Sequence, residues 1–404
     1  MDKSISMRIF IIMICITAFF YNSIGNGYFM LILCLLPVCF KVFSMMTRLE
    51  LNSSAMLMQF IAFAYISSRV SFLRDSSNKF IFMMIILLII KFVLENNFGW
   101  QKFFSSLLFF ITSLSVAATL LSVIAPDMML SVAKVLFRGE AFDTYSILFH
   151  NESYAGIFGQ TAINGYVISI FLAFIVAALF SKNKAKLHYV LLSAGIIALI
   201  LTKKRSFLLA NVIATLVLFI QNSKSDERKL KKAGRLLFLV IAAFLVIRYA
   251  PATQGIMEKI SLLEHSGDLT NGRAVSWNET IEIWKQNPIF GVGTNVMVRG
   301  YGISTHNVYI QILAEMGIFG SISYVLLLWT SFRRSEKAYQ NILKDDMLAH
   351  EKKSIYGVSI YMQVIFIVYS FFGNPVYGIT FMLPYIVFVG VVDSYQKYRR
   401  RVRQ

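Results

Sequence analysis

The sequence predicts an all-α protein that crosses a membrane many times, and three observations support this fold class. Of the 404 residues, 57% are hydrophobic and only 15% are charged, whereas soluble domains have roughly 45–50% apolar and about 25% charged residues. Apolar windows of ~17–22 residues, the length of a bilayer-spanning helix, recur from end to end. No polar stretch is long enough for a separate soluble domain, so we expect one transmembrane domain over residues 1–404.

The apolar windows predict about twelve membrane-spanning helices. They lie near residues 7–22, 27–43, 55–71, 79–95, 103–125, 155–180, 187–203, 205–221, 236–250, 306–330, 355–373 and 376–394. The first window has the basic start of a signal peptide, but no small-residue cleavage site follows it, so we interpret it as a helix. The boundaries are least defined at residues 69–79, where basic residues interrupt the third and fourth windows.

The net charge of +18 is concentrated in short segments between the apolar windows. Residues 221–235, 333–353 and 397–404 are rich in Lys and Arg, and with twelve spans all three fall on the same side as the N-terminus. Because basic loops stay in the cytoplasm, we expect both termini to be cytoplasmic. This distribution is typical of membrane orientation and argues against a nucleic-acid partner.

The sequence shows no motif for a metal or a nucleotide. Its three cysteines, Cys15, Cys34 and Cys39, lie inside apolar windows without a metal-ligand spacing, and no HExxH motif or Gly-rich nucleotide loop is present. We interpret the cysteines as small buried apolar side chains and expect neither a metal nor a cofactor.

One long loop is predicted on the outer side, between the ninth and tenth spans. It covers residues 251–305, about 55 residues, and loops beyond ~15 residues are usually functional or disordered. It contains the helix-compatible stretch "TIEIWKQ" and the turn "NPIFGVGTN", so we expect short interfacial helices. Trp277 and Trp284 are seven residues apart on one helical face, as suits residues at a membrane interface.

Two groups of cations are predicted on the outer side. Lys203, Lys204 and Arg205 are consecutive, and Arg273 precedes the helix-compatible stretch of the long loop. Their side chains can reach lipid phosphates from a helix end, or stay ordinary surface cations. They can also form an anion site, because guanidinium grips phosphate oxygens in a bidentate way and Lys adds a point charge.

A polar stripe opens the tenth span. At 100° per residue, Asn307, Gln311 and Glu315 fall within an arc of ~80°, with His306 at its upper edge. Such a stripe faces a bundle interior or a water-filled cleft rather than lipid. Interhelical hydrogen bonds explain Gln311 and Glu315, but His306 at the water boundary suits a general base, since imidazole titrates near ~6.5. A helix-end residue without chemistry is the alternative for His306.

Three stretches in this order resemble the O-antigen ligase and polymerase superfamily of bacterial surface-polysaccharide assembly. They are "TKKRSFLLA", "NGRAVSWNETIEIWKQNPIFGVG" and "STHNVYIQILAEMGIFG", and "GIFGQTAINGY" adds Asn164 as a supporting residue. The resemblance covers roughly residues 155–325, and its most specific part is the His-Asn start with Glu-x-Gly-x-x-Gly.

The resemblance implies a metal-independent membrane glycosyltransferase with a fold similar to the GT-C class. It implies an undecaprenyl-diphosphate-linked glycan as donor, at the periplasmic face of the bacterial inner membrane. Arg205 and Arg273, with Lys203 and Lys204, would hold the diphosphate. His306 would activate the acceptor hydroxyl, supported by Asn307, Gln311 and Glu315. Membrane lipids and a chain-length regulator are further candidate partners.

Three functions fit these residues to different degrees. A polymerase joins lipid-linked repeat units, and a ligase moves finished glycan to lipid A-core or another terminal acceptor. The outer loop of residues 251–305 is shorter than the corresponding loop of many lipid A-core ligases of the family, and this favours the polymerase. A flippase for lipid-linked oligosaccharide would need ionisable residues near span midplanes and an internal repeat, whereas the conspicuous charges lie at one face.

Overall fold

A computed structural model describes residues 3–20, 55–70, 78–180, 186–223, 273–344 and 350–403. The described secondary structure is helical throughout. The chain forms two compact units. The first comprises Met1–Cys34, Gly99–Ile260 and Glu336–Ile365, and the second comprises Leu35–Phe98, Ser261–Ser335 and Phe366–Gln404.

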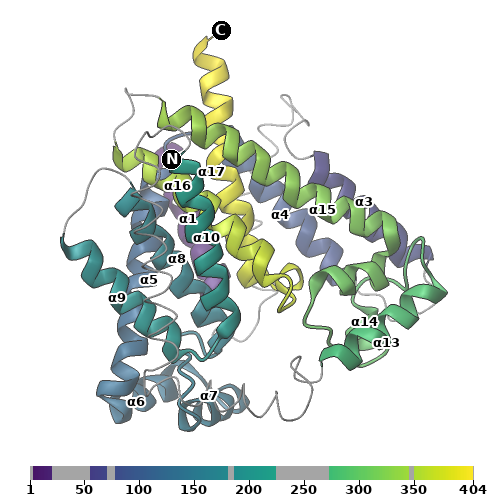
Figure 1. The fold of residues 1–404 in the computed structure, drawn as a ribbon, viewed down its shortest axis with the longest axis horizontal. Helices are drawn as coiled ribbons and strands as arrows, with labels where there is room; N and C mark the ends of the chain where they lie inside the picture. The colour runs from purple at the N-terminus through teal and green to yellow at the C-terminus, as the bar shows by residue number, and fades with distance from the viewer. Residues whose placement is uncertain are drawn as a thin grey trace. The chain divides into compact units, whose positions relative to one another are not determined.

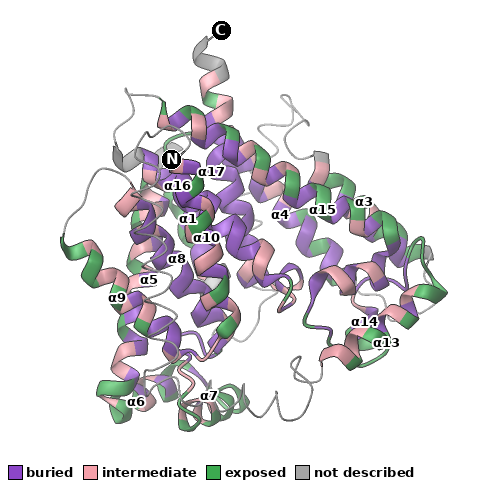
Figure 2. Ribbon diagram, viewed as in Figure 1, coloured by how far each residue is buried: buried purple, intermediate pink, exposed green. Residues whose placement is uncertain are grey.

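The first unit is built around one helix that is buried on every side. Its helices are α1 (Lys3–Phe20), α5 (Trp100–Ile124), α6 (Pro126–Leu136), α7 (Glu140–His150), α8 (Thr161–Phe180), α9 (Lys186–Leu201) and α10 (Arg205–Ser223). Helix α8 is apolar all round, as a central helix must be. Helices α5, α9 and α10 pack against it, and Figure 2 shows its buried surface.

The second unit carries most of the polar outer loop. Its helices are α3 (Ala55–Val70), α4 (Asn78–Asn96), α13 (Arg273–Gln286), α14 (Val296–Arg299), the 3₁₀ turn η4 (Pro375–Tyr377) and α17 (Ile379–Arg403). Helix α15 (Val308–Leu343) and helix α16 (His350–Tyr369) each contribute to both units. Helix α4 packs against α17, as can be followed in Figure 1.

A buried charge network joins α4 to α17. The Lys91 ammonium contacts the carboxylate of Glu95 one turn away and donates to Asp393 over 2.9 Å. Arg334 of α15 donates to the other oxygen of Asp393 over 2.8 Å. Lys91, Glu95 and Asp393 are buried, so each of these charges depends on its partners for stabilisation.

The described helices confirm a polytopic, all-helical membrane protein. Five of them are long and apolar enough to cross a membrane. Helices occupy every predicted span that falls on described residues, whereas the windows 27–43 and 236–250 lie outside them. The total of twelve spans, the single transmembrane domain and the GT-C likeness stay predictions.

The structure differs from the expectation in three places. Two short helices, α6 and α7, follow α5 where only a loop was expected. Helix α8 begins at Thr161 rather than near residue 155, because residues 151–160 form turns. Helix α15 extends to Leu343, well past the predicted end near residue 330. Within the long outer loop, α13 and α14 confirm the expected short helices.

Candidate functional site

The first group of predicted site residues lies on the turn between α9 and α10. Thr202 and Lys203 form this turn, in which Lys203 adopts a left-handed conformation with φ 54°. Arg205 is the first residue of α10 and is exposed. The free N–H groups and the dipole of a helix N-terminus favour anions, so the position of Arg205 adds to the attraction of its own charge.

Lys203 is engaged by the loop that follows α7. Its ammonium donates to the carbonyl of Asn151 over 2.9 Å and lies 3.4 Å from the carboxylate of Glu152. Two further bonds join this loop to the end of α9: Ser153 Oγ donates to the carbonyl of Thr202 over 3.1 Å, and the N–H of Tyr154 donates to Leu201 over 3.1 Å. The turn between α9 and α10, which we call the cationic turn, is therefore hydrogen-bonded to the loop 151–154.

Asn164 supports the same loop from the interior of the unit. The side chain is fully buried on α8 and accepts from Ser115 Oγ over 2.6 Å. Its amide donates to Thr119 Oγ1 over 2.9 Å and to the carbonyl of Tyr154 over 3.0 Å. Because these bonds occupy both the oxygen and the NH₂ group of its side chain, Asn164 serves to hold the backbone of the loop 151–154 in position.

The second group begins with His306, directly before α15. His306 is exposed and has φ 48°, a left-handed conformation that costs a non-glycine residue of order 1–3 kcal/mol. Its Nε2 lies 3.5 Å from Ser304 Oγ. Strain of this kind persists only where the surroundings fix the backbone, and such residues cluster at functional sites.

Asn307 fixes the backbone on the helix side of His306. Its Oδ1 accepts from the N–H groups of Tyr309 at 3.0 Å and Ile310 at 3.3 Å, which is the geometry of a helix N-cap. Thr305 Oγ1 donates to the Asn307 carbonyl over 3.1 Å. The residues on either side of His306 are thus bonded to each other.

Glu315 lies at the centre of the second unit's outer part. Its buried carboxylate accepts from the backbone N–H of Asn295 (2.7 Å) and Met297 (3.3 Å). Gln311 Nε2 donates over 3.0 Å and Tyr377 Oη over 2.6 Å. Tyr377 lies in the 3₁₀ turn η4, just before α17.

The turn after α13 interlocks with α15 through backbone contacts. Val292 N–H donates to Ala314 over 2.9 Å, and Ile318 N–H donates to Pro288 over 3.0 Å. The close approach requires glycine: a Cβ on Gly317, which has φ 65° and kinks α15, would collide with the Ile289 carbonyl. Glu315 and Gly317 of the sequence motif are therefore explained by this interlock.

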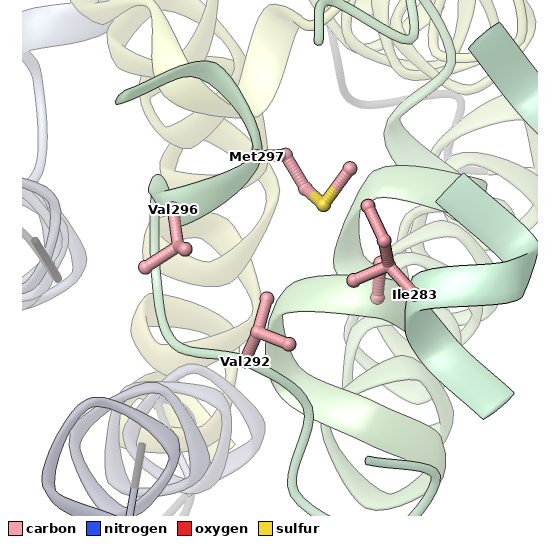
Figure 3. Packing of buried hydrophobic residues seen from close by; sticks show 5 residues of the cluster. Ile283, Val292, Val296 and Met297 are labelled. Atoms are coloured by element: carbon pink, nitrogen blue, oxygen red, sulfur yellow. The ribbon is translucent and has the colours of Figure 1, made fainter. Parts of the chain in front are cut away.

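A small hydrophobic core holds the outer segment together. Figure 3 shows Ile283 of α13 facing Val292, Val296 and Met297, and Ala314 of α15 completes the cluster. Because these residues come from three helices and a turn, the outer segment 273–305 is a packed structure against α15.

Arg273 is the first residue of α13 and is half-buried. It interacts electrostatically with Tyr369 at the end of α16. Farther along α13, Trp277 Nε1 donates to the carbonyl of Thr305 over 2.8 Å. This bond ties the helix that begins with Arg273 to the residue directly before His306.

The structure thus places the predicted residues in two groups. Arg273, His306, Asn307, Gln311 and Glu315 lie in the second unit, whereas Asn164, Lys203, Lys204 and Arg205 lie in the first. Sequence reasoning missed Tyr369, a neighbour of Arg273, and Tyr377, which bonds Glu315, because each lies more than 50 positions away from its partner in sequence and belongs to no motif. Among the described residues, no group of three His, Cys, Asp or Glu side chains could hold a metal ion.

The fold and the packed segment 273–305 define a class of protein. It is a multi-pass helical membrane protein in which this segment begins with Arg273 and lies directly before His306. A family model described as O-antigen ligase matches residues 188–325. This match supports the resemblance to the O-antigen ligase and polymerase superfamily, whose members are glycosyltransferase-like enzymes. No curated protein is significantly similar to the chain.

Proposed function

We propose that the protein is a membrane glycosyltransferase that polymerises undecaprenyl-diphosphate-linked repeat units at the periplasmic face of the bacterial inner membrane. The observation that carries this proposal is the bond from Trp277 to Thr305, which ties the Arg273 helix to the His306 backbone. A cation and a base on one fixed scaffold are what glycan transfer from a diphosphate requires.

The proposed reaction is a displacement at the anomeric carbon of the donor glycan. The acceptor hydroxyl oxygen forms the new C–O bond, and its proton passes to the imidazole of His306. The bond between the anomeric carbon and the diphosphate oxygen breaks, and the diphosphate leaves with the electron pair. Cations that meet this developing charge lower the barrier, so the leaving group does not need a proton.

Arg205 and Arg273 are the proposed diphosphate ligands. Each is the first residue of a helix, where the dipole adds to the guanidinium charge. Lys204 follows as a supporting cation. Lys203 is the weaker candidate, because its ammonium already contacts Asn151 and Glu152.

The ligase is the second candidate, and the matching family model is described as O-antigen ligase. Both reactions use the same kind of donor, so the site residues fit either acceptor. The length of the outer loop, residues 251–305, is our reason for placing the polymerase first. A flippase remains third, because the cations Arg205 and Arg273 begin helices rather than lie within them.

Deletion of the gene separates these functions by the glycan that accumulates. Loss of a polymerase leaves single repeat units attached to the lipid A-core. Loss of a ligase leaves bare core together with long lipid-linked polymer, and loss of a flippase leaves single lipid-linked units on the cytoplasmic side. The polymerase proposal is wrong if long polymer persists in any form.

Replacement of the arginines tests the diphosphate role within the same assay. Arg205→Ala and Arg273→Ala should each reduce transfer severely while the protein stays folded in the membrane. Lys at either position should rescue only part of the activity, since it lacks the bidentate fork. Near-wild-type polymer from both Ala variants would show that these cations only contact lipid headgroups.

A further inference from the structure

Helix α6 presents three chemically distinct faces. At 100° per residue, Met128, Val132 and Val135 fall within an arc of ~60°. Asp127, Ser131 and Lys134 are all exposed and occupy a second arc of ~60°. On the third face, Met129 and Ala133 are buried. We call the first arc the apolar flank and the second the polar flank.

The buried face of α6 packs into the first unit. Ala133 on this face and Phe137 at its end form a cluster with Tyr145 of α7 and Ala155 of the following loop. The rings of Phe137 and Tyr145 stack with their centroids 5.4 Å apart. Helix α6 therefore has a fixed rotation about its axis, and its two exposed flanks have fixed directions.

Two of the three residues of the apolar flank are exposed, and Val132 is half-buried. Val135 is 80% exposed and Met128 is 56% exposed, and Figure 2 shows exposed residues along α6. A flank of this composition beside a polar flank is the pattern of a helix that lies in a membrane interface.

The apolar flank lies close in sequence to the exposed side of a candidate membrane-spanning helix. Helix α5 is long and apolar enough to cross a membrane, and its exposed residues Phe110, Leu114 and Ile124 fall within an arc of ~80° at 100° per residue. Met128 comes four residues after Ile124, past Ala125, whose backbone leaves the helical conformation. Because the exposed apolar side of α5 suits the bilayer, lipid is the occupant that we assign to the flank that follows it.

Helix α6 is too short to cross the membrane itself. Its 11 residues give a length of ~16 Å, against a hydrocarbon core of ~30 Å. It can only lie along the surface. Helix α7 covers its inner side and carries Glu140, Asp143 and Thr144 as exposed polar residues, so this part of the hairpin suits the aqueous side.

The hairpin of α6 and α7 is connected to the cationic turn. The loop that leaves α7 is the loop 151–154, which Lys203 and the end of α9 hold by hydrogen bonds of 2.9–3.1 Å. Arg205 lies two residues beyond Lys203. A shift of the hairpin relative to the bilayer must therefore move the turn that carries Arg205.

We propose that the hairpin α6–α7 lies at the membrane–water interface on the outer side of the inner membrane, with the apolar flank at the boundary of the acyl chains. In this position the hairpin sets the depth at which Arg205 meets lipid-borne phosphate. The second half rests on the proposed function, because it assigns a lipid-linked diphosphate to Arg205. The first half does not depend on that function.

Spin labels on the two flanks test the first half. In a variant with Cys15, Cys34 and Cys39 replaced by Ala, a nitroxide is placed at residue 128 or 135 on the apolar flank. Matched labels at residues 127 and 131 report the polar flank. The full-length protein is reconstituted in vesicles of phosphatidylethanolamine and phosphatidylglycerol, and collisions with oxygen and with a water-soluble nickel chelate are compared.

The labels at 128 and 135 should collide mainly with oxygen, which concentrates in the acyl chains. The labels at 127 and 131 should collide mainly with the nickel chelate. Nickel accessibility at 128 and 135 equal to that at 131 would place the flank in water and overturn the proposal. Low collision rates with both reagents at 128 and 135 would mean that protein, such as a second copy of the chain, covers the flank.

A label at Ser206, next to Arg205, tests the second half without measuring transfer. The double substitution Met128→Asp and Val135→Asp should raise nickel accessibility at residue 206 at least twofold. The matched control, Ser131→Asp on the polar flank, should leave it unchanged. If residue 135 becomes water-accessible in the double variant while residue 206 does not change, the hairpin does not set the depth of Arg205.

Failure to fold would be visible in the same samples. The single substitution Val135→Asp then replaces the double variant, with a smaller expected change in the same direction. Because the readout is depth, a negative result here leaves the transfer chemistry of His306 and Arg273 untouched.

Discussion

The indole nitrogen of Trp277 lies 2.8 Å from the carbonyl oxygen of Thr305 and donates a hydrogen bond to it. This bond joins two parts of the outer segment that are 28 residues apart in sequence. One part begins with Arg273 and the other ends at His306. The relative position of the two proposed functional groups therefore depends on the side chain of Trp277.

Trp277→Phe tests this dependence. The substitution keeps an aromatic ring but removes the N–H donor, which leaves the Thr305 carbonyl without this partner. A hydrogen bond of this kind contributes about 0.5–1.5 kcal/mol, so we expect roughly 3–10-fold slower transfer by a folded protein. The matched control is Trp284→Phe, which removes a 3.2 Å bond to Pro288 at the far end of α13. Equal rates for both variants would contradict the positional role of Trp277.

Glu315→Gln should destabilise the protein strongly. The carboxylate accepts from two backbone N–H groups, Gln311 and Tyr377, whereas Gln offers one acceptor oxygen and adds a second donor. Hydrogen bonds to a charged group contribute about 1.5–3 kcal/mol each. Thermal unfolding in detergent should show a large loss for Glu315→Gln and a smaller one for Tyr377→Phe. An unfolding midpoint unchanged in Glu315→Gln would show that the carboxylate does not hold the outer segment.

Two glycines with a similar positive φ should respond differently to alanine. Gly317 and Gly302 have φ 65° and 68°, a range in which a side chain is strained at both positions. A Cβ at Gly317 would collide with the carbonyl of Ile289, whereas nothing lies within 4 Å of one at Gly302. We expect Gly317→Ala to reduce the folded yield severely and Gly302→Ala to reduce it little. Comparable yields on size-exclusion chromatography would argue against the interlock with α15.

Lys91→Met and Lys285→Met make the same chemical change in opposite environments. Lys91 is buried with Glu95 and Asp393, whereas Lys285 and Glu282 form an exposed pair with a distance of 2.7 Å. Removal of one partner from a buried network costs about 3–5 kcal/mol, and an exposed pair contributes about 0–1 kcal/mol. Denaturation should separate the two variants by several kcal/mol. Similar stabilities would mean that Arg334 alone satisfies Asp393.

Much of this fold could be predicted from the sequence, because bilayer thickness fixes the length of an apolar helix. The same rule explains what was missed. Helices α6 and α7 are too short to appear as spans, and their outward flanks interrupt the apolar pattern. The extension of α15 beyond residue 330 was hidden because Arg333 and Arg334 read as the start of a basic loop, although Arg334 bonds Asp393.

The site could be predicted only as far as its motifs reached. The stripe of Asn307, Gln311 and Glu315 predicted supporting roles. In the structure Asn307 caps α15 and Gln311 donates a hydrogen bond to Glu315, and such contacts can support a site. The partners of this stripe come from residues 295–297 and 377, which no periodicity in the sequence connects. The left-handed backbone at His306 was also not predicted, because positive φ is uncommon for any residue other than glycine.

The role of His306 is the central claim, and transfer by purified His306→Gln protein on a lipid-linked donor, measured together with donor binding, tests it most directly. Gln keeps a hydrogen-bonding side chain but cannot take the acceptor proton. Loss of a general base slows a reaction typically 10²–10⁴-fold, so we predict a loss of this size with donor binding retained. Full activity would show that His306 is only a helix-end residue. Loss of both activity and donor binding would make it a binding residue instead of the base.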